Sequence, residues 1–584
     1  MKLLLLDRPA DPALPSRREV EFFGPWAQPI LTPDDLRPPA FEPYPDPVAV
    51  DAAARRAVQA AGELLDALVR TLPELTRVRR GERFWKAFLG HHAIAMAGLV
   101  EDIRNRENAL PDEEYVLGKP ALSGEPPQAP SWASDGAYIL LDASFRLRAT
   151  LACLRRSYPR SETVAYTPAP REVVRDENAL RRWLPLLRRA TRWSRRLSEE
   201  GGTEGGPSLV YDFEESLDPL LSSGAALRIP KDVHDVPEAG AVARDPRLRA
   251  ALREALPAPY GELLSWSLPS AALEGLSLLV ERLEPRLRPL ASSIKRVYSQ
   301  GEAFSGSEPQ RAGLGLLADG GARVSIAQHG GGAIYQAHSS LFLERRISDE
   351  YLVWGEGVAA GGSAGGNGAN SVRVLPSTYL AGLRGKRKTR PRWDALCVVL
   401  EEGAHIKWLY SPLYPDLAHD YFQRERTLFD LLCSGDRRVA FKVYRWGFGW
   451  GQARWLHARY PQADLLVEGS FIDYSLKSRL VIVDYLSTAF FEMIAMGHPF
   501  LATWNRRWFR GNAEFEPLLD GLADAGIFHE EPERLMRSFD EAVRDPEAWW
   551  AEPRRREAVA RLAERFSPIS DRTLQSWREE LTRA

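Results

Sequence analysis

The chain beyond residue 292 alternates short apolar runs with helical stretches. Four apolar runs, at 294–298, 324–327, 351–354 and 372–375, come before residue 384, and the first two flank a helical segment at 308–317. Five more follow residue 392, at 395–400, 439–443, 465–467, 480–484 and 500–503. Alternation of this kind is typical of βαβ units, whose buried parallel strands are covered by helices. The sequence therefore predicts an α/β protein with two doubly wound, Rossmann-type domains.

A basic, loop-like segment separates the two groups of strands. It reads RGKRKTRP at 384–391 and has no apolar period, so we place an inter-domain linker at 384–392. A surface loop within one domain is an equally good local interpretation. We expect one N-terminal Rossmann-like domain over 1–383, starting with a strand at 3–6, and a second over 393–584 that ends in helices. The two should face each other across a cleft.

The N-terminal domain is expected to carry a helical insertion at about 45–205. Helical periodicity covers 51–72 and 83–104, and Pro73 is expected to separate the two helices. Basic residues around 180–187 lie between apolar positions at helical spacing, which favours a solvated helix face over a nucleic-acid surface.

Charge and cysteine content exclude several classes of protein. Lys and Arg number 77 against 79 Asp and Glu, so no global positive field would hold nucleic acid. The three cysteines, Cys153, Cys397 and Cys433, are too far apart for a disulfide framework or a zinc site. An apolar run of only four residues precedes Asp7, which is too short for a signal peptide. We expect a cytoplasmic protein, at most peripherally associated with the inner face of the membrane.

The run at 480–499 has the features of a nucleotide site. An apolar strand leads to Ser487 and Thr488, a helical run containing Glu492 follows, and Gly497-His498-Pro499 ends it. Ligands of open α/β sheets bind at the carboxyl ends of the strands, where a helix N-terminus attracts phosphate. A helix cap followed by a stop signal is the simpler structural interpretation. The combination resembles the nucleotide-binding element of GT-B glycosyltransferases, which implies that Ser487 and Thr488 bind phosphate and Glu492 binds ribose.

A second candidate site follows the strand at 324–327. Gln328 and His329 end this strand, and Gly330, Gly331 and Gly332 come next, so a ligand can approach the backbone closely beside an imidazole. Because histidine titrates near neutral pH, His329 is our first choice for a catalytic group or a ligand of the donor phosphate. A structural histidine at a strand end is the alternative.

Several of these motifs together resemble a known family. QHGGG at 328–332, Glu344 and the DEYLVWG run at 349–355 resemble surface-carbohydrate transferases of spirochaetes and other bacteria. EFFGPW at 21–26 and FWKAFLG at 84–90 resemble early landmarks of that family, although an acidic residue before Trp26 is missing and a Gly-rich insertion follows Gly357. The resemblance implies a GT-B fold, adds Glu344 to the catalytic candidates, and extends distantly to capsule and teichoic-acid transferases, some of which use cytidine nucleotides.

Further charged residues follow other predicted strands. Lys442 and Arg445 end the run at 439–443 and could bind phosphate or a sugar carboxylate, although ion pairs with Asp436 or Asp464 explain them equally well. Carboxylates also lie at the ends of the strands predicted at 137–142, 208–212 and 395–400, and each is a weaker candidate for a catalytic base: Asp142, Asp212, Glu401 and Glu402.

These observations predict a glycosyltransferase. The donor would be a nucleotide-activated sugar, which could be a keto-sugar acid, and the acceptor a surface glycan or lipid-linked glycan. The sequence contains no P-loop, HExxH or DxD motif, so we expect neither a metal ion nor a cofactor beyond the donor. A nucleotide-sugar epimerase or hydrolase on the same fold, and a non-catalytic glycan-binding assembly protein, remain as alternatives.

Overall fold

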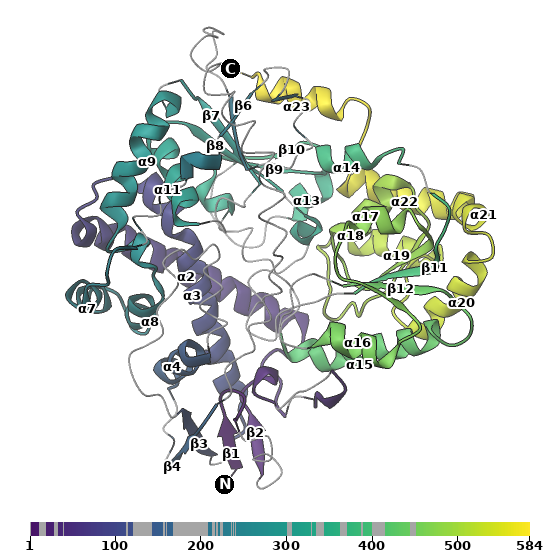
Figure 1. The fold of residues 1–584 in the computed structure, drawn as a ribbon, viewed down its shortest axis with the longest axis horizontal. Coiled ribbons are helices and arrows are strands. Elements are labelled where there is room, and N and C mark those ends of the chain that lie inside the picture. Colours follow the sequence, from purple (N-terminus) through teal and green to yellow (C-terminus); the bar gives the residue numbers. More distant parts are fainter. Residues whose placement is uncertain are drawn as a thin grey trace.

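The computed structural model contains three parallel β-sheets with helices packed on them (Figure 1). The structure describes residues 2–10, 19–28, 33–38, 40–112, 115–120, 143–155, 158, 160–166, 208–212, 217, 220–221, 226–229, 231–234, 236, 239, 241–291, 293–300, 307–328, 330–334, 344–361, 371–386, 389–399, 415–443 and 451–583.

The first large sheet has six strands. Its order is β10-β9-β8-β7-β5-β6, and every neighbouring pair is parallel. Strands β7 and β9 are buried at every position, as expected where helices cover both faces. The chain order reverses direction between β5 and β7. The strands are β5 (Ser208–Asp212), β6 (Leu227–Arg228), β7 (Arg296–Ser299), β8 (Arg323–Ala327), β9 (Glu350–Val353) and β10 (Ser371–Val374).

The second large sheet has five parallel strands in the order β13-β12-β11-β14-β15. Its strand order reverses direction between β11 and β14, and in such sheets ligands bind where the strand order reverses. The prediction of two doubly wound α/β domains is confirmed by these two sheets. The strands are β11 (Trp393–Val398), β12 (Val439–Lys442), β13 (Asp464–Leu466), β14 (Ser478–Val483) and β15 (Phe500–Ala502).

A third, four-stranded sheet occupies the N-terminal region, in the order β2-β1-β3-β4. The structure thus differs from a single Rossmann-like domain over 1–383, because the strand at the chain start pairs with the strands on either side of it in this separate sheet and not with the six-stranded one. Runs of two to four apolar residues do not specify which sheet they join. The strands are β1 (Lys2–Leu5), β2 (Val20–Phe22), β3 (Tyr115–Pro120) and β4 (Arg160–Val164).

Two long helices connect this small sheet to the six-stranded domain. Helix α2 (Pro47–Thr76) begins at Asp46, whose carboxylate accepts a hydrogen bond from the Ala49 amide, and packs along α3 (Glu82–Ala109). We expected Pro73 to separate two helices, but it lies inside α2 and the helix continues to Thr76. Packing of α2 on α3 outweighs the roughly 3 kcal/mol that an interior proline costs.

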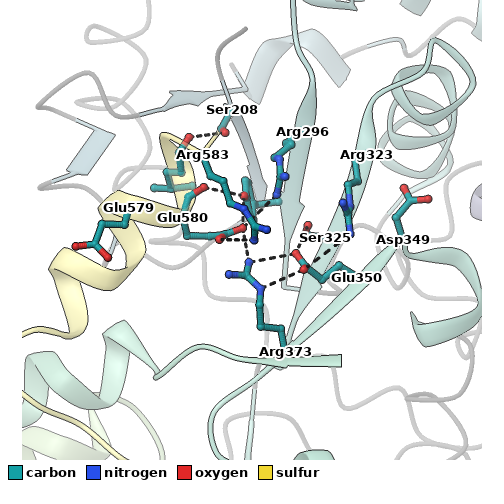
Figure 2. Close-up of polar contacts among 12 residues, drawn as sticks. Ser208, Arg296, Arg323, Ser325, Asp349, Glu350, Arg373, Glu579, Glu580 and Arg583 are labelled. Carbon is teal, nitrogen blue, oxygen red and sulfur yellow. Dashed lines mark hydrogen bonds and ion pairs between the residues drawn. The ribbon is translucent and has the colours of Figure 1, made fainter. Parts of the chain in front are cut away.

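The C-terminal helix α23 (Thr573–Leu581) returns to the six-stranded sheet, and Figure 1 shows it beside that sheet. Trp577 and Leu581 pack against Tyr298 and Leu352 on one sheet face. Glu580 accepts a hydrogen bond from the Tyr298 hydroxyl at 2.7 Å and pairs with Arg296 and Arg373, as Figure 2 shows for the two arginines. The last helix therefore belongs structurally to the first large domain.

Of the remaining helices, α4 (Ala143–Cys153), α7 (Pro246–Ala255) and α8 (Tyr260–Ser267) pack on α2, α3 and one another, and the others belong to the two large domains. The others are α9 (Leu276–Ala291), α11 (Glu308–Asp319), α13 (Glu356–Gly361), α14 (Thr378–Leu383), α15 (Ala418–Leu432), α16 (Gln452–Arg459), α17 (Phe471–Ser475), α18 (Thr488–Met496), α19 (Glu516–Asp524), α20 (Pro532–Ala542), α21 (Pro546–Ala551) and α22 (Pro553–Phe566), and the short 3-10 turns are η1 (Pro25–Ala27), η2 (Pro33–Asp35), η6 (Lys231–His234), η8 (Ser270–Ala272), η9 (Gly331–Ile334) and η10 (Pro415–Leu417).

Candidate functional site

The glycine turn after β8 and the start of α18 are in direct contact. The Gly331 amide donates a hydrogen bond of 3.1 Å to the Thr488 hydroxyl. A Cβ atom on Gly331 would lie 2.8 Å from the Ser487 carbonyl, and one on Gly330 would lie 2.9 Å from the Thr488 hydroxyl. A side chain fits at neither position without a shift. The two places that the sequence singled out in different domains therefore form one site.

Helix α18 begins with an unused hydroxyl. Ser487 is the N-cap residue in extended conformation, but its side chain makes no capping hydrogen bond. The Ser487 side chain is buried, and its hydroxyl has no hydrogen-bond partner among the described residues. Buried hydroxyl groups are normally paired, and the first amides of a helix bind anions. The end of β14 thus presents a hydroxyl and a positive helix end at the point where the strand order reverses.

Glu492 lies one turn into α18 and is buried at 8% exposure. Its carboxylate accepts a hydrogen bond from the hydroxyl of Tyr379, on helix α14 of the first large domain. Burial raises the pKa of Glu492, and the Tyr379 hydrogen bond opposes this shift only in part. The sequence offered no signal for Tyr379, because this pairing depends on how α14 packs against α18.

Gln328 holds the glycine turn in place. It is almost fully buried, and its side-chain amide donates to the Gly330 carbonyl at 2.9 Å and accepts from the Trp354 amide at 3.0 Å. The Trp354 indole donates to the Gln328 carbonyl at 3.1 Å and packs edge-to-face on Phe491 of α18. Gln328 and Trp354 therefore position the turn against the other domain. Gly332 lies in η9, and His329 lies outside the described residues.

Glu344 is buried at a distinct position in the first large domain. Its carboxylate accepts a 3.0 Å hydrogen bond from the Tyr351 hydroxyl. Burial, followed by the charge of Glu344, raises the pKa of Tyr351 well above its usual value. No contact between Glu344 and Ser487 or Thr488 is among those described, so its catalytic role remains a prediction.

Of the two cations predicted to bind phosphate, Lys442 is described by the structure and Arg445 is not. The Lys442 ammonium donates to the carbonyls of Val443, Leu466 and Val467 at 2.9, 3.3 and 2.8 Å, which joins the ends of β12 and β13. Arg445 lies outside the described residues, as do Glu401, Glu402 and Asp142; Asp212 ends β5, and its side chain is not described.

A carboxyl pair that the sequence analysis missed lies beside the site. Asp484 directly follows β14, and the Tyr421 hydroxyl bridges it to Glu425. Burial, then the charge of Asp484, raises the pKa of Glu425 well above its usual value. A phenol can donate to only one of two carboxylates, so this arrangement favours the protonated form of Glu425. The available signal was an aspartate at the end of the predicted strand 480–484.

Residues 252–581 match the family described as LIC12162 family transferase, which is more than half of the chain. The chain belongs to the LIC12162 transferase family. This confirms the transferase family that the QHGGG resemblance predicted. Comparison with curated proteins finds no match.

Solved structures give more distant similarities to this LIC12162-family chain. A complex of S. aureus MnaA with UDP is 12% identical, covering 63% of this chain and 92% of that chain, with a TM-score of 0.34. TarM is 11% identical over 53% of this chain and 58% of that chain, with a TM-score of 0.32. A variant of Os79 from O. sativa, in complex with UDP, is 10% identical over 64% of this chain and 100% of that chain, with a TM-score of 0.33.

The LIC12162-family match covers the whole glycine-turn and α18 site but not the four-stranded sheet. In the described part of the chain, no group of three His, Cys, Asp or Glu side chains could hold a metal ion. Among the described helices, none is both long and apolar enough to cross a membrane.

Proposed function

We propose that this LIC12162-family transferase moves a glycosyl group from a nucleotide-activated sugar to a bacterial surface glycan. The observation that carries the proposal is the buried Ser487 hydroxyl at the start of α18, which has no hydrogen-bond partner among the residues that the structure describes and lies opposite the Gly331 turn of the other domain. A phosphate placed there would be bound by the hydroxyl and by the first amides of the helix. The Ser487 hydroxyl makes no capping hydrogen bond, and the Gly331 backbone lies close to the start of α18. Together these two observations favour a phosphate ligand over a simple helix cap.

In the proposed reaction, an acceptor hydroxyl attacks the anomeric carbon of the donor. The bond from that carbon to the phosphate oxygen breaks, and the nucleotide leaves with the electron pair. Ser487, Thr488 and the α18 N-terminus would stabilise the negative charge on the leaving phosphate. His329 would accept the proton of the acceptor hydroxyl, and Glu492 would bind the ribose hydroxyls. Glu344, Lys442 and Arg445 remain proposed contributors to the same site.

Ser487→Ala gives the sharpest test. If the hydroxyl serves only the fold, its removal should leave nucleotide binding unchanged. If it binds phosphate, the variant should fold with unchanged or slightly higher stability, since a buried unpaired hydroxyl is lost, yet bind nucleotide about tenfold more weakly. Calorimetric titration with UDP, CDP, CMP and GDP measures the nucleotide affinity of the wild type and of the variant.

Ser470→Ala is the matched control. Ser470 is also an N-cap serine in the second large domain, but its side chain accepts a hydrogen bond from the Asp473 amide. Its replacement should lower stability by about 1 kcal/mol and leave nucleotide affinity unchanged. Absence of saturable nucleotide binding to the wild type would refute the proposal, and conversion of a donor sugar without acceptor would favour the epimerase or hydrolase alternative.

A further inference from the structure

The EFFGPW motif, which the proposed function leaves without a role, forms the wall of a pocket. Its first four residues, Glu21 to Gly24, line a pocket of about 190 Å³ at the end of β2. This is more than ten times the roughly 10–15 Å³ that one water needs. The rest of the lining comes from the start of β2, from the residue after η1, from the segment after η2 and from the second large domain: Val20, Gln28, Arg37, Pro38, Ala40, Phe41 and Asp416.

Local contacts hold the motif wall in position. The Trp26 ring folds over Gly24 so closely that a Cβ there would lie 2.4 Å from it, and the Trp26 indole donates to the Leu6 carbonyl at 3.1 Å. Gln28 is bonded twice to Arg37: its amide donates to the Arg37 carbonyl at 3.1 Å and accepts from the Arg37 amide at 2.9 Å. The pocket is thus formed before any ligand binds, which lowers the entropic cost of binding.

The carboxylate of Asp416 is held on the opposite wall by a buried arginine. Arg106, fully buried on α3, donates two hydrogen bonds to Asp416, at 2.8 and 2.6 Å, and its guanidinium lies 4.6 Å from the Trp26 ring centre. Arg106 also binds Asp102, which accepts a hydrogen bond from Tyr44. Because buried ion pairs add little to stability, the clearest consequence of this network is a fixed position for Asp416.

The lining chemistry fits a neutral, hydroxyl-rich ring. Both carboxylates in the wall already have a cationic partner, Glu21 in Lys2 at 3.1 Å and Asp416 in Arg106, so neither calls for a cationic ligand. The same carboxylates can accept hydrogen bonds from hydroxyl groups, and the guanidinium of Arg37, which also lines the pocket, can donate them. Phe22 and Phe41 provide apolar surface on which a sugar ring can pack.

The pocket lies next to the proposed donor domain. Asp416 is in η10, and the following residue, Leu417, lines a smaller pocket of about 20 Å³ that also contains Asp484 at the end of β14. Turn η10 packs on η1 of the EFFGPW motif. One short turn therefore separates this pocket from the strand end that leads to Ser487.

We propose that the pocket between the EFFGPW motif and Asp416 binds one neutral sugar unit of the acceptor glycan. The assignment of this sugar to the acceptor rests on the proposed glycosyl transfer, whereas sugar binding itself does not. The four-stranded sheet, which lies outside the family match, then supplies acceptor recognition to a nucleotide-binding core.

Saturation-transfer NMR of the full chain with methyl glycosides of glucose, galactose, mannose and N-acetylglucosamine tests the pocket. At least one glycoside should bind the wild type, and Ala40→Trp, which fills the pocket from an exposed rim position, should weaken that binding at least tenfold. Ala10→Trp, at an exposed position outside the pocket lining, should leave it unchanged. Glu21→Gln should weaken binding severalfold while the protein stays folded.

Three outcomes would overturn the inference: no glycoside binds, Ala40→Trp binds as well as wild type, or methyl glucuronide binds more tightly than the neutral glycosides. Titration with the nucleotides UDP, CDP, CMP and GDP, run on the same samples, separates this result from the proposed function. Ala40→Trp should keep wild-type nucleotide affinity. Glycoside binding without nucleotide binding would preserve the pocket and refute the glycosyl-transfer proposal.

Discussion

The Gly331 amide and the Thr488 hydroxyl are joined by a 3.1 Å hydrogen bond across the two large domains. They are 157 residues apart in the chain. Gly331 is the first residue of η9, which follows β8, and Thr488 is the first residue of α18, which follows β14. This hydrogen bond places the backbone of the glycine turn, which a ligand can approach closely, next to the N-terminus of α18. Any phosphate bound by α18 would therefore lie beside the QHGGG element.

Gly331→Ala should disturb this contact. The new methyl group would meet the Ser487 backbone at 2.8 Å, which cannot give way as a flexible side chain could. We expect a loss of about 1–3 kcal/mol in the free energy of unfolding, measured by urea denaturation, and weaker nucleotide binding. Gly382→Ala is the control, because Gly382 is exposed in α14 with nothing within 4 Å of a Cβ, and it should be neutral or stabilising by up to about 1 kcal/mol. Equal effects of the two substitutions would contradict the contact.

Glu492→Gln should change how stability depends on pH. Burial raises the folded-state pKa of Glu492 above its ordinary value of 4.5, so the folded state retains a proton that the unfolded state has released. The contribution of this group to stability is therefore greatest below pH 4.5 and falls as pH rises through the folded-state pKa. The glutamine variant lacks this loss, so its stability relative to wild type should increase with pH in urea denaturation series. Glu557→Gln, on the exposed side of α22, should show no such trend.

Tyr421→Phe tests the carboxyl pair beside β14. The phenol bridges Asp484 and Glu425, and its removal takes a hydrogen-bond partner from two buried carboxyl groups. A loss of about 1–3 kcal/mol is expected in denaturant unfolding. Tyr474→Phe removes a hydroxyl that donates to the Glu468 carbonyl near the surface, and should cost less. A Tyr421 variant as stable as wild type would show that the bridge is unimportant.

Glu580→Ala should weaken the attachment of the C-terminal helix. Glu580 is buried and pairs with Arg296 and Arg373 (Figure 2). Its removal takes the counter-charge from the buried Arg296 and a hydrogen-bond acceptor from Tyr298, whereas the half-buried Arg373 keeps its ion pair with Glu350. We expect a loss of about 3–5 kcal/mol and faster proteolysis of the chain end. Its neighbour Glu579 is exposed and accepts a hydrogen bond from Gln575 of the same helix, so Glu579→Ala should cost less than about 0.5 kcal/mol. Comparable losses would contradict the docking contact.

The elements around the site were predictable because their signals are local. The apolar run at 480–483 gave β14 its burial, and Ser487 and Gly497 mark the ends of α18, with Gly497 at a left-handed φ of 62°. The predicted break at Pro73 was wrong because helix continuity there depends on contacts that are not local. The effect of Pro73 on a helix was overridden by the packing of α2 on α3, which no local rule contains.

The chain by itself determined strands β7 to β15, the ends of α18, the glycine turn and the candidacy of Ser487, Thr488 and Glu492. These follow from side-chain periodicity and from backbone preferences that act over a few residues. Only the tertiary structure decided that Gly331 meets Thr488, that Tyr379 binds Glu492, and that Arg106 reaches Asp416, 310 residues away. Such contacts join side chains on separate elements, so they depend on how whole sheets and helices pack and on the burial that packing produces.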